Sequence, residues 1–156
     1  MTYRFEVITD ERLDDFIQAI RPLIKQHYQE LTLDKDVIKL MPDWDRYREL
    51  QRLRRLATLA CWLNEELVGY GIFFLESHIH YKENLFARND ILFLRPDHRQ
   101  GRLGITLIKE CEQMLKSLNV SKVFWHVKQQ RDFRVLLHRM GYKDEDIIVG
   151  KALKEA

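Results

Sequence analysis

Residues 90–108 constrain the fold more than any other stretch, because they predict a strand, a tight turn and a helix in direct succession. The strand is the apolar run Ile91 to Leu94, and Pro96 ends it because proline has no N–H for a sheet ladder. A helix is predicted from about Gly104, since apolar residues then recur at three- and four-residue spacing. They are Leu107, Ile108, Cys111, Met114, Leu115 and Leu118.

The turn between this strand and helix carries two glycines and two arginines. Gly101 and Gly104 leave backbone N–H groups open to a ligand, because neither has a Cβ. Arg99 and Arg102 add positive charge at the helix end that the backbone dipoles already make positive. The turn therefore predicts a phosphate site. It lacks the Gly-Lys-Ser/Thr of a Walker loop and the G-x-G-x-x-G of a dinucleotide-binding fold, so neither of those folds is predicted.

The rest of the chain predicts one α+β domain over residues 1–156, with a mixed, mostly antiparallel sheet and helices on both faces. The expected order is β-α-α-β-β-β-α-β-α-β. Helices are expected after Thr9-Asp10 (broken or kinked at Pro22), after Pro42-Asp43 and after Asp132, and residues 27–36 resemble a linker. Strands are expected at 3–8, 57–63, 67–76, 122–127 and 147–149, and His78, His80 and Tyr81 are expected in a loop.

Composition narrows the class of protein. The chain has 26 Lys and Arg against 24 Asp and Glu, a formal charge of +2, so general binding to nucleic acid or membranes is not predicted. The arginines of residues 46–55 are expected on a solvated helix face. Cys61 and Cys111 are expected to be buried thiols, and no metal-ligand motif occurs. No signal peptide or apolar run of membrane length is visible, so a cytoplasmic protein is expected.

The turn resembles the acetyl-CoA signature of the GNAT N-acetyltransferases, Gln/Arg-x-x-Gly-x-Gly/Ala between a strand and a helix. Arg99 and Gly104 match its ends, whereas Arg102 takes the place of the middle glycine and Gly101 stands one position earlier. Residues 130–142, which end in Gly141-Tyr142, resemble the second coenzyme A segment of the family. Further short stretches, among them residues 42–44 and 125–128, resemble a subset common in phage and bacterial genomes.

The resemblance implies a GNAT-like acyl-CoA N-acyltransferase fold with acetyl-CoA as acyl donor. The pyrophosphate would lie on backbone N–H groups of the turn, and Phe93 and Leu94 would offer backbone groups to the pantetheine and the thioester carbonyl. Gln130 falls near a further cofactor position. The expected cofactor-binding residues are thus Phe93, Leu94, Arg99, Gln100, Gly101, Arg102, Leu103, Gly104, Ile105 and Gln130.

For proton transfer, the expected catalytic residues are Asp90 and His126. Asp90 at the start of the central strand is the first candidate for the base, with capping of the strand end by Asp90 or Asn89 as the alternative. His126 is the second candidate, with a structural histidine as its alternative. The usual acid of the family, a tyrosine, is replaced by Leu137. The thiolate would then leave unassisted, or Tyr142, Tyr81 or His126 would protonate it, or catalysis is lost.

The implied function is transfer of an acetyl group to a primary amine of a small molecule or protein by direct attack. His80, Tyr81 and Trp44 are the expected substrate-binding residues, and a homodimer is a further expectation. Two alternatives remain. One is a catalytically inactive GNAT-fold module that binds coenzyme A or a protein partner, which Leu137 motivates. The other, weaker one is nucleic-acid binding by the arginines of the second helix.

Overall fold

The computed structural model describes residues 2–155, in which five strands form one mixed sheet in the order β1-β2-β3-β4-β5. The strands are β1 (Tyr3–Val7), β2 (Leu56–Leu63), β3 (Glu66–His78), β4 (Tyr81–Leu94) and β5 (Lys122–Phe124). The helices are α1 (Leu13–Leu31), α2 (Trp44–Arg52), α3 (Leu103–Ser117) and α4 (Arg134–Arg139), with short 3₁₀ turns η1 (Asp10–Arg12), η2 (Pro96–His98) and η3 (Gln129–Arg131). Neighbouring strands are antiparallel except β4 and β5, which are parallel. The predicted mixed, mostly antiparallel α+β fold is confirmed.

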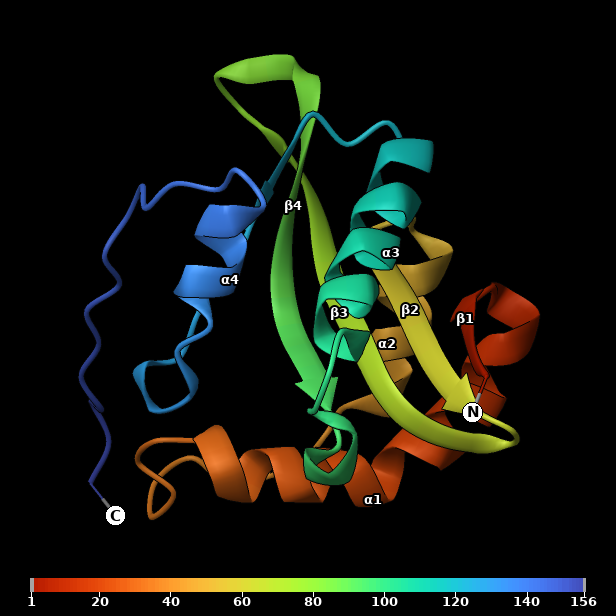
Figure 1. Ribbon diagram of the computed structural model, residues 1–156. Helices are drawn as coiled ribbons and strands as arrows, with labels where there is room; N and C mark the ends of the chain where they lie inside the picture. The colour runs from red at the N-terminus through yellow and green to blue at the C-terminus, as the bar shows by residue number, and fades with distance from the viewer. Residues whose placement is uncertain (1, 156) are drawn as a thin grey trace.

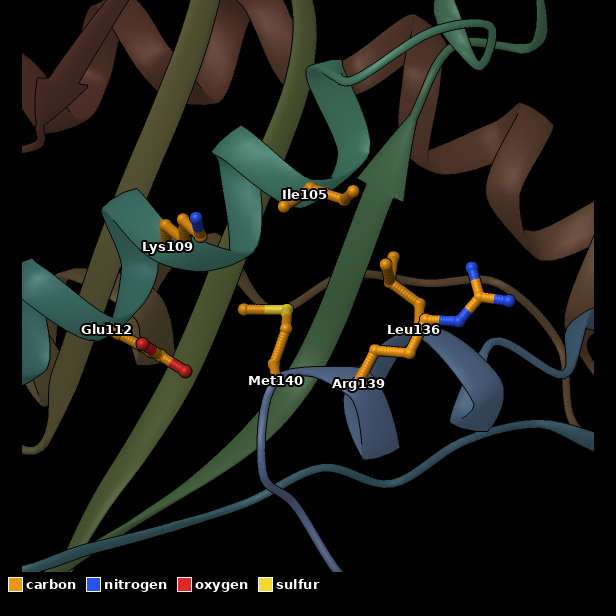
Figure 2. Close-up of a pocket in the computed structure, with 6 residues that line it drawn as sticks. All are labelled: Ile105, Lys109, Glu112, Leu136, Arg139 and Met140. Atoms are coloured by element: carbon orange, nitrogen blue, oxygen red, sulfur yellow. The ribbon is translucent and has the colours of Figure 1, made fainter.

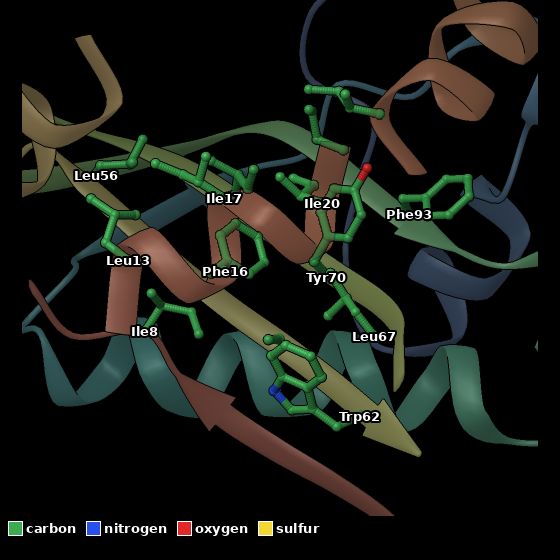
Figure 3. Close-up of a cluster of buried hydrophobic side chains, with 14 residues drawn as sticks. Ile8, Leu13, Phe16, Ile17, Ile20, Leu56, Trp62, Leu67, Tyr70 and Phe93 are labelled. Carbon is green, nitrogen blue, oxygen red and sulfur yellow. The ribbon is translucent and has the colours of Figure 1, made fainter. Parts of the chain in front are cut away.

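Helices cover both faces of the sheet, so the protein has two hydrophobic clusters. On one face, α1 buries an apolar stripe of Leu13, Phe16, Ile17, Ile20 and Ile24 against the strands (Figure 3). Helix α3 lies against the other face (Figure 1), where it buries Leu103, Leu107, Cys111, Met114 and Leu115. Both stripes follow the three- and four-residue spacing that the sequence shows. Helix α2 begins after Asp43 as predicted, and Asp43 caps it, because its side chain accepts a hydrogen bond from the Arg46 N–H at 2.9 Å.

Several element boundaries differ from the sequence-based expectation. Pro22 lies inside α1 without ending it, and the helix continues through the expected linker to Leu31. The expected loop at 78–81 is instead a hairpin turn at Ile79 and His80, with His78 in β3 and Tyr81 opening β4. Strand β5 ends at Phe124, three residues early. Among residues 2–155 no strand follows α4, so the expected last strand at 147–149 is wrong. Its side chains are strongly exposed, Ile147 at 92%.

Strand β4 contains an irregularity that positions the site. Phe73 of β3 pairs with Asn89, whereas the preceding Ile72 pairs with Ile91, so Asp90 has no partner opposite it. This extra residue is a β-bulge. The side chains on either side of the bulge confirm it, because Ala87 belongs to the α3 cluster and Ile91 to the α1 cluster although they are four residues apart. A regular strand would place both on one face.

Candidate active site

Strands β4 and β5 stop pairing and separate just after the middle of β4. Their ladder consists of Phe86–Lys122, Ala87–Val123 and Arg88–Phe124, and it stops there. Beyond it, the Asn89 side chain connects to the backbone of His126. The residues of β4 from Asp90 to Leu94 therefore have one edge that β5 does not cover, and this edge is called the β4–β5 opening below.

The start of α3 supplies unpaired backbone donors beside this opening. Gly101 has a φ of +76°, a left-handed conformation that favours glycine and turns the chain into the helix. Arg102 stands at the N-cap without a side-chain cap, so the first N–H groups of α3 have no partner within the helix. A Cβ at Gly104 would meet no atom within 4 Å. The turn thus presents an open, positively polarised end of a helix, as the sequence predicted.

The two arginines of the turn behave differently. Arg99 is tied into the protein, because its Nε donates to the Leu94 carbonyl at 2.7 Å and its Nη2 donates to the Glu30 carboxylate at 2.9 Å. Its guanidinium also lies 5.6 Å from the Phe93 ring. The Arg102 side chain is exposed, like that of Gln100. Arg99 therefore fastens the turn to β4 and α1, and its charge is already matched by Glu30.

Strand register decides which backbone groups face the opening. The Arg95 N–H donates to Val68 of β3 at 2.8 Å, so residue pairs bonded to β3 alternate from there. Phe93 therefore exchanges its backbone bonds with Tyr70, while Leu92 and Leu94 present theirs to the side that β5 has left. The backbone groups that face the opening are thus those of Leu92 and Leu94, whereas those of the expected Phe93 face β3. The sequence could not show this, because both residues are apolar and only the pairing separates them.

Asp90 lies on the bulge and is exposed to solvent. Surrounding protein nevertheless removes enough water to raise the pKa of Asp90, and Arg88 opposes that rise only partly. Burial, followed by Tyr47 and then by the charge of Asp90, raises the pKa of Tyr70. Burial, followed by the charge of Asp90, raises the pKa of Tyr47. A carboxylate with a raised pKa near an open strand edge is suited to accept a proton. Asn89, the alternative capping residue, forms side-chain hydrogen bonds with the backbone of His126, just after β5.

His126 follows the end of β5, with an exposed side chain. Desolvation lowers the pKa of His126, and the positive charges of Arg88 and Lys128 lower it further. The imidazole is therefore neutral at pH 7, which suits a base or a relay better than an acid. Arg88 acts on the pKa of both Asp90 and His126, so the two expected catalytic side chains lie in one electrostatic neighbourhood.

The expected substrate-binding residues lie in two different parts of the protein. Trp44 packs beside Tyr47, with ring centres 5.3 Å apart, on the α1 side of the sheet. His80 and Tyr81 lie at the hairpin turn in an exposed aromatic group with His78. Tyr81 is nine residues from Asp90 along β4, which at about 3.3 Å per residue is about 30 Å. The structure does not bring His80 and Tyr81 to the site.

Three other side chains, from α1, β3 and α2, lie near the Asp90-to-Leu94 part of β4 instead. His27 of α1 lies edge-on to Phe93, with ring centres 5.6 Å apart, and burial lowers the pKa of His27. Tyr70 of β3 is fully buried, and within residues 2–155 its hydroxyl has no hydrogen-bond partner. Tyr47 of α2 completes the group. None of the three was among the expected site residues, because helical or strand spacing alone does not show which buried ring borders the site.

The other face carries a pocket of about 370 Å³ between α3 and α4. Figure 2 shows the six side chains that line it: Ile105, Lys109 and Glu112 of α3, Leu136 and Arg139 of α4, and Met140 directly after α4. Gln130 is exposed in η3, before α4. Lys109 and Arg139 add two cations that were not among the expected site residues, and a coenzyme A phosphate would find a counter-charge in them. In the sequence, Lys109 and Arg139 are ordinary basic residues on two separate helices, and nothing there shows that the two side chains line one pocket.

Leu137, which takes the position of the usual family acid, is buried as well as apolar. It is only 4% exposed, so it is a residue through which α4 packs against the rest of the protein. Tyr142 donates its hydroxyl to Glu112 at 2.6 Å, and burial raises the pKa of Tyr142. Of the three substitutes considered for the acid, Tyr81 lies at the far hairpin and Tyr142 is bonded to Glu112, whereas His126 shares the influence of Arg88 with Asp90.

Among residues 2–155, no helix combines the length and apolar character needed to cross a membrane. Comparison with curated protein sequences gives no match. Solved structures of the same fold include an aminoglycoside acetyltransferase from an uncultured soil metagenomic sample in complex with sisomicin, with a TM-score of 0.74, 17% identity and 97% coverage of each chain. Glucosamine-6-phosphate N-acetyltransferase from Arabidopsis thaliana has a TM-score of 0.72, 14% identity and coverage of 99% of this chain and 100% of that one.

A third solved structure is that of a predicted acetyltransferase with acetyl-CoA from Clostridium acetobutylicum, with a TM-score of 0.68, 12% identity and 97% coverage of each chain. At these identities the likeness concerns the fold. The family model of the acetyltransferase (GNAT) family matches residues 17–142, most of the chain, including the turn before α3 and the segment through Tyr142. The opening between β4 and β5, the uncapped start of α3 and this match agree, and the chain belongs to the acetyltransferase (GNAT) family.

Proposed function

We propose that this protein is an acetyl-CoA-dependent N-acetyltransferase that acetylates a primary amine by direct attack. The observation that carries the proposal is the position of Asp90, a carboxylate with a raised pKa on the bulge that also begins the uncovered edge of β4. The free donors at the start of α3 support binding of the donor's pyrophosphate, and Lys109 and Arg139 support further phosphate contacts.

In this mechanism the chain orients the reactants and moves one proton. The N–H groups of Leu92 and Leu94 face the opening, where they polarise the thioester carbonyl. Asp90 accepts the proton that the amine loses as its nitrogen bonds to the acetyl carbon. The carbon–sulfur bond then breaks, and the thiolate leaves and takes up a proton from solvent, either directly or relayed by His126. Holding the amine in place supplies much of the rate.

The acceptor is proposed only as an amine. The structures of similar fold include proteins named as acetylating aminoglycosides, glucosamine-6-phosphate and ribosomal-protein alanine. The test is release of free thiol from acetyl-CoA in the presence of a panel that contains an aminoglycoside, an amino sugar, a polyamine and peptides with a free N-terminus or lysine. If the folded protein gives no thiol above the buffer rate with any acceptor, the enzyme proposal fails.

A second candidate is a module that binds coenzyme A without turnover, which the burial of Leu137 at the usual acid position favours. Gly104→Leu separates binding from folding. The added side chain meets open space, and leucine is a better helix former than glycine by about 0.5–1 kcal/mol, so the fold should be retained. It fills the cradle, and we expect calorimetry to show loss of coenzyme A binding. Unchanged binding would contradict both candidates.

A further inference from the structure

A side chain, and not a backbone group, makes the last connection between β4 and β5. The Asn89 Oδ1 accepts from the His126 N–H at 2.5 Å, and its Nδ2 makes a longer contact of 3.5 Å to the His126 carbonyl. The backbone ladder has already ended at Arg88 and Phe124. Asn89 thus spans the distance at which the two strands have become too far apart to pair directly.

A carboxamide is suited to this position because it carries a donor and an acceptor, as a peptide group does. Asn89 is only 5% exposed, so water has little access to replace its bonds. An apolar side chain here would leave the His126 N–H without its partner, and β5 could then move relative to β4. An aspartate would retain the acceptor but not the donor.

The bulge directs two neighbouring side chains to different tasks. Asn89, before it, reaches sideways to β5, and Asp90, on it, lies near Tyr47 and Tyr70 on the α1 side. The separation of β5 from β4 and the place of the carboxylate are therefore set by adjacent residues. On the other side of β5, Trp125 is held by edge-to-face contacts with Phe73, Phe133 and Tyr142. Asn89 fixes the backbone of the very next residue, His126.

We propose that Asn89 is a positioning residue that sets the width of the β4–β5 opening at the level of the reacting thioester. The inference rests on the proposed function, and it adds that the distance between the acetyl group and Asp90 depends on one buried carboxamide. Asn89 itself does not touch the reacting atoms. It acts through the backbone of His126, which forms the opposite wall.

Three variants test the proposal. Asn89→Leu keeps the volume and removes both bonds, whereas Asn89→Asp keeps the acceptor for the His126 N–H. Thr58→Val is the matched control, since Thr58 is an equally buried polar residue on β2, which does not border the opening. We expect hydrogen exchange at the His126 amide to accelerate at least about 100-fold in Asn89→Leu, to stay slow in Asn89→Asp, and to be unchanged in Thr58→Val. The amides of Val123 and Phe124 should remain protected in all three.

Kinetics provide the second readout. A displacement of about 1 Å costs on the order of 100-fold in rate, so kcat in Asn89→Leu should fall by about that factor while the acetyl-CoA Kd weakens by less than about tenfold. In Asn89→Asp, a second carboxylate beside Asp90 should shift the midpoint of the pH–rate profile to higher pH.

The proposal is overturned if Asn89→Leu keeps His126 protected, if its kcat stays within about threefold of the wild type, or if Thr58→Val shows the same losses. Failure of the proposed function looks different, because then the wild type itself cleaves no acetyl-CoA with any acceptor, whether or not it binds the cofactor. In that case the claim about the thioester falls with it, and exchange at His126 still decides whether Asn89 holds the two strands.

Discussion

The Nη2 of Arg99 donates a hydrogen bond to the Glu30 carboxylate at 2.9 Å, across 69 residues of sequence. This pair joins the turn before α3 to the last turns of α1, and Arg131 of η3 lies 3.8 Å from the same carboxylate oxygen. Three segments that border the opening thus share one acidic side chain. Because Arg99 also donates to Leu94, its guanidinium is used in holding the protein together.

We therefore predict that Arg99 contributes more to stability than Arg102 does. Arg99→Lys cannot make both bonds, because lysine lacks the planar fork of arginine. The pair is partly exposed, so the loss in the free energy of unfolding should be only about 1 kcal/mol. Urea denaturation measures it, and Arg102→Lys, at an exposed position, should change less than about 0.3 kcal/mol. Equal effects of the two substitutions would contradict the assignment.

Asp90→Asn should reduce activity and increase stability at neutral pH. Removing a general base typically costs between about 100- and 10,000-fold in rate. The folded state raises the pKa of Asp90 above its ordinary value of 3.8, so the folded protein holds this proton more strongly than the unfolded chain. Stability is consequently lost as pH rises through that interval, and the neutral amide avoids the loss.

Melting temperatures at pH 4 and pH 7.5 provide the check. The variant should melt above the wild type at pH 7.5, and the two should approach each other at pH 4. A variant that is less stable at both pH values would show that the carboxylate is needed for folding and is not a strained catalytic group.

His27 should make the protein sensitive to mild acid. Burial lowers the pKa of His27 below its ordinary value of 6.5, Glu30 opposes this, and Arg99 and Lys128 add to it. Between the lowered value and 6.5 the unfolded chain binds the proton more strongly, so stability falls as pH falls through this interval. The effect is about 1.4 kcal/mol for each unit of pKa difference.

His27→Phe keeps an aromatic ring against Phe93 and removes the titration. Urea midpoints at pH 7.5 and 5.5 should therefore differ less in this variant than in the wild type. His126→Phe serves as the comparison, because its side chain is exposed and its removal should alter the pH dependence less. The prediction fails if the wild type and His27→Phe lose equal stability on acidification.

Gly71→Ala should destabilise the sheet by about 1–3 kcal/mol through overpacking. A Cβ at Gly71 would lie 2.7 Å from the Cys111 Sγ and 3.1 Å from a Phe73 ring carbon. Adding Cys111→Ala should recover part of the loss, because the smaller side chain makes room. Gly104→Ala is the matched control in open space, and it should be neutral or mildly stabilising. No recovery in the double variant would mean that the ring, and not the thiol, carries the clash.

The local parts of this fold could be predicted from the sequence. Helix α3 begins and ends within one residue of its expected bounds, because its apolar spacing is regular and Gly101 marks the turn. The helix with Pro22 was harder. Three buried residues before Pro22 (Phe16, Ile17 and Ile20) and one after it (Ile24) pack against the sheet. This packing outweighs the helix break that proline alone favours.

Features that depend on distant partners could not be predicted. The hairpin turn at Ile79 and His80 has none of the glycine or asparagine residues that usually announce a turn, so its histidines resembled a functional loop. The segment at 147–149 has strand-forming residues, but a strand also needs a neighbour to pair with. Likewise, the roles of Asn89 and Leu92 follow from the register of β3 and from where β5 ends, and neither is encoded near those residues.

The bulge has a consequence for how catalysis and scaffold can vary independently. Because Asp90 is the one residue of β4 between Asn89 and Ile91 without a partner, removing it would give an uninterrupted alternation. Ala87 would stay on the α3 face and Ile91 and Phe93 on the α1 face. Under the proposed function, a single-codon deletion would thus remove the base without exchanging any core residue, and a single-codon insertion would restore it. In descendants of such a chain, the presence or absence of chemistry would appear as a gap in an alignment and not as a substitution.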